Sequence, residues 1–397
     1  MCAAVLKHWR EAASAILVHQ RRPTIGQNFQ KNGVNPKTKS PDTEQTTVAP
    51  VAGGLEMLVM KRSSRSSYMP ELYVFPGGTA DDADFSREWM GIFRAETPEK
   101  KEERFGFVKT KSENVPMFSR QRDAKFSSIP SEIAFRICAL RETFEESGVL
   151  IARKGESLCS YKQNLSPCEA FNFGQDHASE LEEWRQKVTS EPTQFLQLCK
   201  KYDIVPDVWS MFDWSDWLTP KFGDPLSTKR FDSAFFICCL EEKPHVAEDA
   251  SELVHFQWST PQEMIRENRQ GKIHLAPPQF YEAHRLLNFA SADDLMNFLR
   301  QRVGQPMERW MPVRVQCADA VLFLFPGDSL YPSEPDIDGV KPALVMDKTL
   351  EELEAISPKR HRGVQLPPFQ DSKPGSPPKF TVECNVQPRF GHVKPVL

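Results

Sequence analysis

The spacing of apolar positions along the chain predicts strands that alternate with helices. Short runs in which almost every position is apolar are typical of buried strands. Apolar residues three and four positions apart instead predict helices that pack by one face. We therefore expect a mixed α/β (α+β) class. The predicted strands cover residues 12–19, 55–60, 72–75, 231–240, 253–258, 313–315 and 320–325.

The clearest predicted helix extends from Pro130 to Gly148. Proline is favoured in the first turn of a helix, and glycine ends a helix by adopting left-handed backbone. The residues between them place an apolar face toward a core. This face consists of Ile133, Ile137, Leu140 and Phe144. A second helix is expected to begin at Pro261, after Ser259 and Thr260, and to extend to Arg269.

One principal domain over residues 8–290 accommodates this pattern, with segments that interrupt it. Residues 23–50 are rich in Asn, Thr, Lys, Gln and Pro, so we expect a flexible loop there. A charged, irregular insertion is expected at 79–128 and a helical one at 153–216. Beyond the domain we expect an extension packed on it at 291–356 and a loosely ordered, Pro- and Lys-rich tail at 357–397.

The composition of the chain disfavours several classes of function. The chain has 50 basic and 54 acidic residues and a net charge of −4, so it has no general attraction to nucleic acid or to an anionic membrane. Its nine cysteines lie mostly in apolar runs, without the paired spacing of a disulfide framework or zinc site, which favours a reducing compartment. No apolar run approaches the ~20 residues of a membrane span. The basic start resembles a mitochondrial presequence, although we interpret residues 12–19 as the first core strand.

Three glutamates of the predicted helix are candidates for metal binding. Glu142, Glu145 and Glu146 stand at positions i, i+3 and i+4, which share one face. Three like charges repel one another unless cations lie between them, and carboxylate oxygens are ligands that Mg²⁺ or Mn²⁺ prefers. Arg141 precedes Glu145 by four residues and can hold that carboxylate. The alternative, a solvated acidic face, is disfavoured by the apolar opposite side of the helix.

The run from residue 141 to 149 resembles the second half of the Nudix box, Gly-x5-Glu-x7-Arg-Glu-U-x-Glu-Glu-x-Gly-U, where U is a bulky aliphatic residue. Thr143 departs from the pattern at the first U. The matching residues are Arg141, Glu142, Glu145, Glu146, Gly148 and Val149. The resemblance implies a Nudix fold, a mixed sheet sandwiched between helices. It also implies a hydrolase of nucleoside diphosphate derivatives, with Arg141 and the three glutamates as catalytic residues and Mg²⁺ or Mn²⁺ on the glutamates.

The first half of the box is interrupted. The nearest glycine pair, Gly77 and Gly78, ends 63 residues before Arg141 instead of 14, so we expect an insertion of 49 residues between the glycines and the helix. The first glutamate of the box would fall on Ile133; Glu132 is adjacent, and we do not assign it as a ligand. The glycines would let the backbone approach the site.

Residues 58–78 resemble, without a gap, a coenzyme A signature that ends in Phe-Pro-Gly-Gly. Arg62, Ser63 and residues 75–78 match, whereas Ser67 and Glu71 replace an Arg and a Gly of the signature. The resemblance implies that Lys61, Arg62, Arg65, Gly77 and Gly78 contact the substrate, with the basic residues near the 3′-phosphate of coenzyme A. The alternative is a set of exposed basic residues at a strand end.

Residues 217–220, 230–236 and 277–282 occur in the order found in one branch of the family, and the resemblance covers residues 8–330. That branch is the peroxisomal acyl-coenzyme A diphosphatases of the Nudix motif-nineteen type. It implies cleavage of coenzyme A and acyl-CoA esters to 3′,5′-ADP and (acyl-)4′-phosphopantetheine, in peroxisomes. The final Pro395-Val396-Leu397 shares only its Leu with the Ser-Lys-Leu address, and the mitochondrion is the alternative.

Two other classes of function remain open. A Nudix hydrolase of another substrate, such as a capped RNA end, needs little basic surface, so RNA stays a secondary partner. A non-catalytic Nudix-fold binding module is the other alternative. The intact set of three glutamates counts against such a module.

Overall fold

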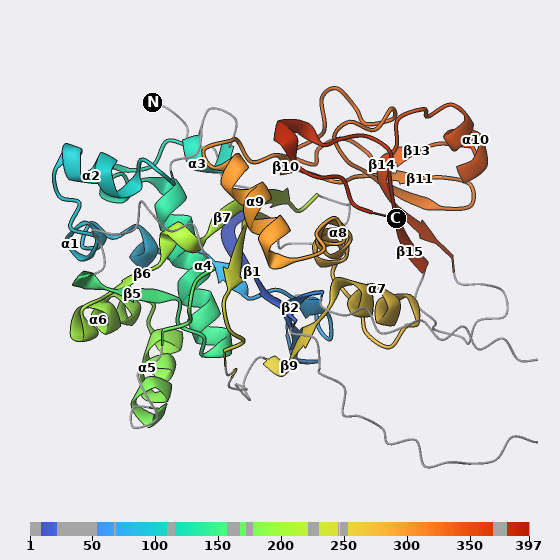
Figure 1. The fold of residues 1–397 in the computed structure, drawn as a ribbon. Helices are drawn as coiled ribbons and strands as arrows, with labels where there is room; N and C mark the ends of the chain where they lie inside the picture. The colour runs from blue at the N-terminus through green and yellow to red at the C-terminus, as the bar shows by residue number, and fades with distance from the viewer. Residues whose placement is uncertain are drawn as a thin grey trace, which may run out of the picture.

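The computed structural model describes residues 9–21, 54–66, 69–108, 116–156, 167–171, 178–220, 230–244, 246, 253–367 and 379–396. The segment predicted as a flexible loop, 23–50, lies outside these residues. Figure 1 shows a central sheet with helices on both sides and a second, smaller sheet beyond α8. In the described part of the chain, no helix is long and apolar enough to cross a membrane.

The central sheet has eight strands, in the order β10-β7-β8-β1-β2-β3, with β4 paired to β1 and β9 paired to β2. The middle pair, β1 and β8, is parallel from Arg10↔Phe231 to His19↔Leu240. The strands predicted in this region are confirmed. The eight strands are β1 (Arg10–Gln20), β2 (Leu55–Arg62), β3 (Tyr73–Val74), β4 (Gly77–Thr79), β7 (Phe212–Leu218), β8 (Phe231–Leu240), β9 (Leu253–Ser259) and β10 (Arg309–Trp310).

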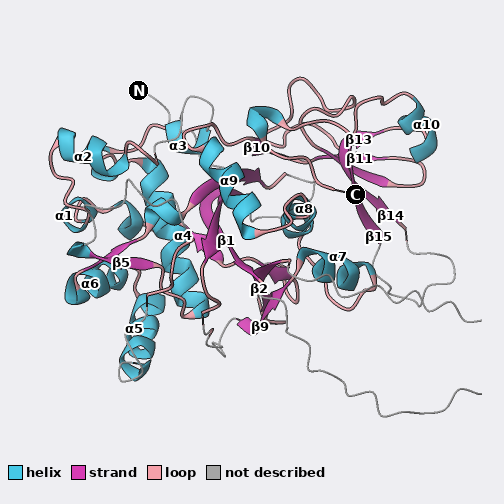
Figure 2. Cartoon of the chain, viewed as in Figure 1, coloured by secondary structure: helices cyan, strands magenta, loops and turns pink. Residues whose placement is uncertain are grey.

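Side chains alternate across β1 and fill two cores, as the period of a strand requires. Ala13 and Leu17 pack toward α4 (Ser131–Ser147). Ile16 and Val18 pack on the opposite side, which is covered by α7 (Pro261–Arg269), α8 (Pro277–Leu286) and α9 (Ala292–Arg302). Figure 2 shows the strands between these two groups of helices, which confirms the predicted sandwich.

The insertion at 79–128 is not irregular, because its aromatic side chains join the core on the α4 side. Phe85, Trp89, Phe93 and Phe105 are buried there. Phe93 meets Phe105 edge to face, with ring centroids 5.2 Å apart. Charged residues between these aromatics concealed the short helices η1 (Asp82–Phe85), α1 (Trp89–Ile92), α2 (Pro98–Phe105), α3 (Pro116–Ser119) and η3 (Ala124–Phe126).

The second insertion is helical as expected but ends earlier than residue 216. It contains α5 (Ala178–Ser190), α6 (Thr193–Tyr202), and a separate pair of strands, β5 (Ala152–Lys154) and β6 (Ile204–Pro206). β7 belongs to the central sheet instead. The register of β7 against β8 shifts between Asp213 and Ser215, and the side chain of Asp216 is buried beside Arg309.

The first part of the predicted C-terminal extension packs on the principal domain. α9 contributes side chains to the same core as β1 and β2, and β10 pairs with β7. The predicted pair of strands, β11 (Val313–Gln316) and β12 (Val321–Leu324), is confirmed as an antiparallel pair. These two strands form a five-stranded sheet with β13 (Leu344–Val345), β14 (His361–Leu366) and β15 (Lys379–Cys384), and α10 (Leu350–Ala355) lies between β13 and β14.

The prediction of a loosely ordered tail is wrong for the described residues after 357. β14 and β15 are two of the five strands of the second sheet. Arg362 is fully buried and forms an ion pair with Asp328 at 2.7 Å. Because both partners lie far apart in sequence, the proline- and lysine-rich composition gave no sign of this ordering.

Candidate active site

The helix α4 holds the three predicted glutamates on one edge. It begins after Pro130 and ends at Gly148, which adopts the left-handed conformation with φ of 72°, as predicted. Arg185 of α5 donates to the carbonyl oxygens of Glu145 and Glu146 at 2.8 and 2.6 Å. A cation at the C-terminal end of a helix donates hydrogen bonds to its free carbonyl groups and interacts favourably with the negative end of its dipole. The second insertion therefore fixes the C-terminal end of α4, which carries the glutamates.

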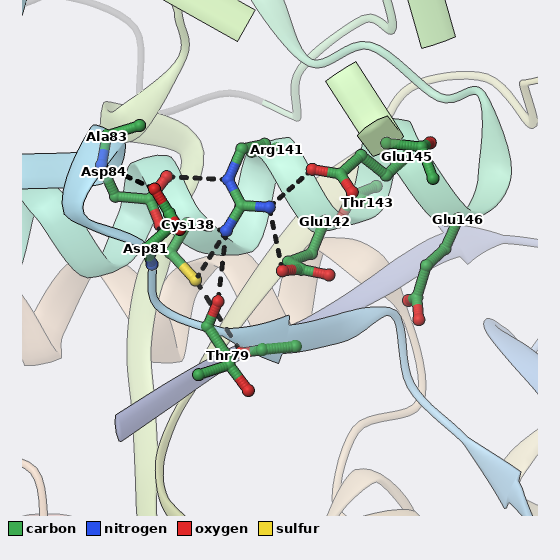
Figure 3. Close-up of polar contacts among 12 residues, drawn as sticks. Thr79, Asp81, Ala83, Asp84, Cys138, Arg141, Glu142, Thr143, Glu145 and Glu146 are labelled. Atoms are coloured by element: carbon green, nitrogen blue, oxygen red, sulfur yellow. Dashed lines mark hydrogen bonds and ion pairs between the residues drawn. The ribbon is translucent and has the colours of Figure 1, made fainter. Parts of the chain in front are cut away.

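Arg141 is the centre of the polar contacts shown in Figure 3. Its Nε and Nη2 donate to the two carboxylate oxygens of Asp84 at 2.8 and 3.0 Å. Its Nη1 contacts Glu145 at 2.5 Å and Glu142 at 2.9 Å. One buried guanidinium thus orients two of the three glutamates and fastens them to η1.

Asp84 is a site residue that our sequence analysis missed. Gly78 and Asp84 stand six positions apart, which is the Gly-x5-acid spacing of the box counted forward from the glycine. The insertion therefore enters after this acidic residue. Glu132 lies ten residues before Glu142 in α4, about 15 Å along the axis, and is not brought to the site.

The two glycines bring β4 against the carboxylates. Gly77 donates its backbone N–H to Glu146 Oε2 at 2.8 Å. Gly77 has a φ of +156°, and a Cβ there would lie 2.4 Å from the carbonyl oxygen of Ala13. A Cβ on Gly78 would lie 2.3 Å from Glu142 Oε2. Both positions require glycine because no space remains between β1, β4 and the glutamates.

The electrostatics of the three glutamates indicate unbalanced negative charge. Burial raises the pKa of Glu142 to about 7, against the opposing effect of Arg141 and with a further increase from Glu145. Burial, then the charge of Glu142, holds the pKa of Glu146 well above its ordinary value. The pKa of Glu145 is also raised, chiefly by burial. Together with Asp84, these are four carboxylates, and Arg141 contacts three of them, Asp84, Glu142 and Glu145.

This donor set fits a divalent cation in its chemistry and charge. Only oxygen donors are present, as hard cations such as Mg²⁺ prefer, and a cation would offset the charge of the buried carboxylates. In the present arrangement Glu145 is turned onto Arg141 (Figure 3). Within the described ranges, no three His, Cys, Asp or Glu side chains converge as a ready ligand group.

A cavity of about 430 Å³ opens beside Glu142, Glu146 and the two glycines. Arg62 lines it. The structure does not bring the other two predicted basic residues to this cavity. Lys61 forms an ion pair with Glu71 at 2.7 Å, and Arg65 is exposed elsewhere. The register of β2 against β9 shifts between Lys61 and Arg62, and of these two residues only Arg62 lines the cavity.

Comparison with known proteins agrees with this site. Residues 9–286 match the family model of the NUDT19 Nudix domain, and residues 314–370 match that of the NUDT19 C-terminal domain. The acyl-coenzyme A diphosphatase NUDT19 of Xenopus laevis is 37% identical over 396 residues, covering 98% of this chain and 96% of its own length. The human protein of the same name is 35% identical over 392 residues, covering 98% and 94%.

A more distant relative and a solved structure extend the comparison. The putative nudix hydrolase 7 of Caenorhabditis elegans is 24% identical over 278 residues, 70% of each chain. A crystal structure of a Nudix hydrolase from Alicyclobacillus acidocaldarius has a TM-score of 0.45 and 18% identity, covering 73% of this chain and 96% of its own. The match of both domain models and the near full-length identity show that the chain belongs to the NUDT19 family of Nudix hydrolases.

Proposed function

We propose that this protein hydrolyses the diphosphate bond of coenzyme A and acyl-CoA esters to 3′,5′-ADP and (acyl-)4′-phosphopantetheine. The observation that carries the proposal is a large cavity that contains Glu142 and Glu146 of the Nudix helix in one wall and Arg62 in another. The names of the vertebrate relatives, acyl-coenzyme A diphosphatases, support the choice of substrate.

In this proposal the glutamates bind metal, and Arg141 positions two of them. Glu142, Glu145 and Glu146 would hold Mg²⁺ or Mn²⁺. When bound, such an ion neutralises the diphosphate and makes a water acidic enough to attack at neutral pH. Arg141 is buried and already bound to Asp84, so it positions Glu142 and Glu145 and does not touch substrate. Arg62 adds positive charge beside Glu146, where the diphosphate must lie.

The glycine turn shapes the approach of the substrate. Gly77 and Gly78 both line the cavity, and neither carries a side chain that would fill it. The diphosphate can therefore come close to the backbone of β4 and to the glutamates behind it. A non-catalytic module would not need this access together with all three glutamates.

Turnover by the purified protein tests the proposal. We expect hydrolysis of coenzyme A and acyl-CoA to require Mg²⁺ or Mn²⁺ and to be abolished in Glu146→Gln, whose amide is isosteric but a weak ligand for a hard cation. Glu183→Gln, which changes an exposed glutamate of α5, is the matched control and should retain full activity. Preference for capped RNA or ADP-ribose over coenzyme A species would overturn the substrate assignment.

A further inference from the structure

Two arginines line the substrate cavity at different points along the sheet. Arg62 lies near Glu146, since its charge lowers the pKa of that carboxyl group. Arg10 begins β1, four residues before Ser14, which is paired with Gly77. At the ~3.3 Å rise of a strand, its Cα lies about 13 Å along β1 from the glycine that holds Glu146. The cavity therefore offers positive charge both beside the catalytic glutamates and away from them.

Arg10 is available to a ligand. Its backbone N–H donates to the carbonyl oxygen of Arg230 at 2.8 Å, so sheet pairing fixes its position. Its guanidinium is exposed, lines the cavity and has no hydrogen bond or ion pair to another described residue. An arginine of this kind is well suited to bind a phosphate through two parallel hydrogen bonds.

Gln279 supplies a second, independent sign that a ligand binds in this cavity, besides Arg10. Its side chain lines the cavity and is 6% exposed, yet its Oε1 is buried without a hydrogen-bond donor among the described residues. A buried amide oxygen without a donor is costly, so a ligand N–H is its expected partner. The amide group of glutamine matches the N6 and N7 edge of adenine.

Two aromatic side chains line the same cavity as Arg10 and Gln279. Trp217 and Phe231 both line the cavity. The indole of Trp217 is held in place because its Nε1 donates to Glu282 Oε1 at 2.9 Å. Flat apolar surfaces beside a glutamine amide and a free arginine are the features that bind a nucleobase and its phosphate.

We propose that the adenosine 3′-phosphate end of the substrate binds here, with adenine at Gln279 between the aromatic residues and the 3′-phosphate at Arg10. This inference rests on the proposed function. Arg62 then lies beside the diphosphate, and the pantetheine arm leaves past the apolar side chains of Met69 and Val74, which line the cavity near it. In this proposal the 3′-phosphate is bound by Arg10, and not by Lys61, Arg62 or Arg65 as the coenzyme A signature implied.

Calorimetric binding of the product 3′,5′-ADP, compared with 5′-AMP, tests the role of Arg10. Wild type should bind 3′,5′-ADP about ten- to a hundredfold more tightly, the range of a charged hydrogen bond. Arg10→Ala should bind the two nucleotides alike. Arg65→Ala removes an exposed arginine outside the cavity and should keep the wild-type ratio. An Arg10→Ala protein that keeps the ratio, or an Arg62→Ala protein that loses it instead, overturns the placement.

Inosine 3′,5′-bisphosphate, which lacks the N6 amino group, tests Gln279. Wild type should prefer the adenine nucleotide, and Gln279→Met should lose that preference, whereas Gln262→Met on the exposed face of α7 should keep it. Thermal melting establishes that each variant is folded. Hydrolysis of coenzyme A is measured on the same preparations. Turnover with a nucleotide preference independent of Arg10 and Gln279 rejects this placement alone; absence of turnover in wild type rejects the proposed function.

Discussion

Replacing Asp84 by asparagine should show how much the ion pair between Asp84 and Arg141 contributes to stability and to the position of the glutamates. Asp84 and Arg141 are 1% and 2% exposed and share two hydrogen bonds of 2.8 and 3.0 Å. The asparagine keeps the size of the side chain but removes its charge and presents an N–H group to the guanidinium. Arg141 would then be a buried cation whose remaining carboxylate contacts are with Glu142 and Glu145.

The expected loss of stability is large. Removing one partner of a buried ion pair costs about 3–5 kcal/mol. At roughly 2–4 °C per kcal/mol for domains of this size class, the melting temperature should fall by about 6–20 °C. Because Arg141 also orients Glu142 and Glu145, the Mg²⁺ concentration for half-maximal activity should rise roughly ten- to a hundredfold, as when a residue that orients a metal ligand is lost.

Differential scanning calorimetry and a Mg²⁺ titration of coenzyme A hydrolysis measure the two effects. Asp82→Asn is the matched control, because Asp82 is in the same 3-10 helix and its side chain is 78% exposed. It should change stability by no more than about 0.5 kcal/mol. An Asp84→Asn protein with the wild-type melting temperature and Mg²⁺ dependence would refute the role given to this pair.

Three further predictions concern the glycine turn, a buried carboxylate pair and location. Gly78→Ala should lower kcat about a hundredfold, because a Cβ 2.3 Å from Glu142 displaces that carboxylate, whereas Gly91→Ala, with nothing within 4 Å, should be active. Burial, then the charge of Asp232, holds the pKa of Asp216 well above its ordinary value. Unfolding therefore releases a proton, and the stability of wild type minus that of Asp216→Asn should fall as pH rises above the ordinary pKa of an aspartate, by up to 1.36 kcal/mol per pH unit; a flat difference contradicts this. A fusion with a fluorescent protein at the amino end should give peroxisomal puncta, as in the family branch it resembles, and mitochondrial or diffuse fluorescence would reject that location.

Local patterns predicted the parts of the fold that local interactions determine. The helix α4 was delimited correctly because its proline, apolar spacing and terminal glycine all lie within one segment. The partner of Arg141 was missed because Asp84 is 57 residues away in sequence, beyond an insertion that conceals the box. Ion pairs between distant elements, such as Arg362 with Asp328, leave no periodic trace.

The residues that line the substrate cavity could not be identified from the sequence either. An arginine at the start of a strand and a glutamine in a helix are ordinary surface residues in sequence. Arg10 and Gln279 become site candidates only when the pairing of β1 with β8 and the packing of α8 place both in one wall. Of the basic residues predicted to contact substrate, Arg62 lines the cavity, whereas Lys61 is paired with Glu71.

The contacts of residues 392–396 with α8 have a consequence for synthesis of the protein. Arg285 donates to His392 at 2.6 Å and to Glu282 at 2.7 Å, and Glu282 in turn holds Trp217 in the cavity wall. Ribosomes add about 5–20 residues per second, and N-terminal domains generally fold first. A nascent chain that has released Glu142, Glu145 and Glu146 still lacks the segment that covers Arg285. The enzyme should therefore become fully stable only after residue 396 has left the ribosome, and messages that end translation soon after α8 should give chains that proteases remove.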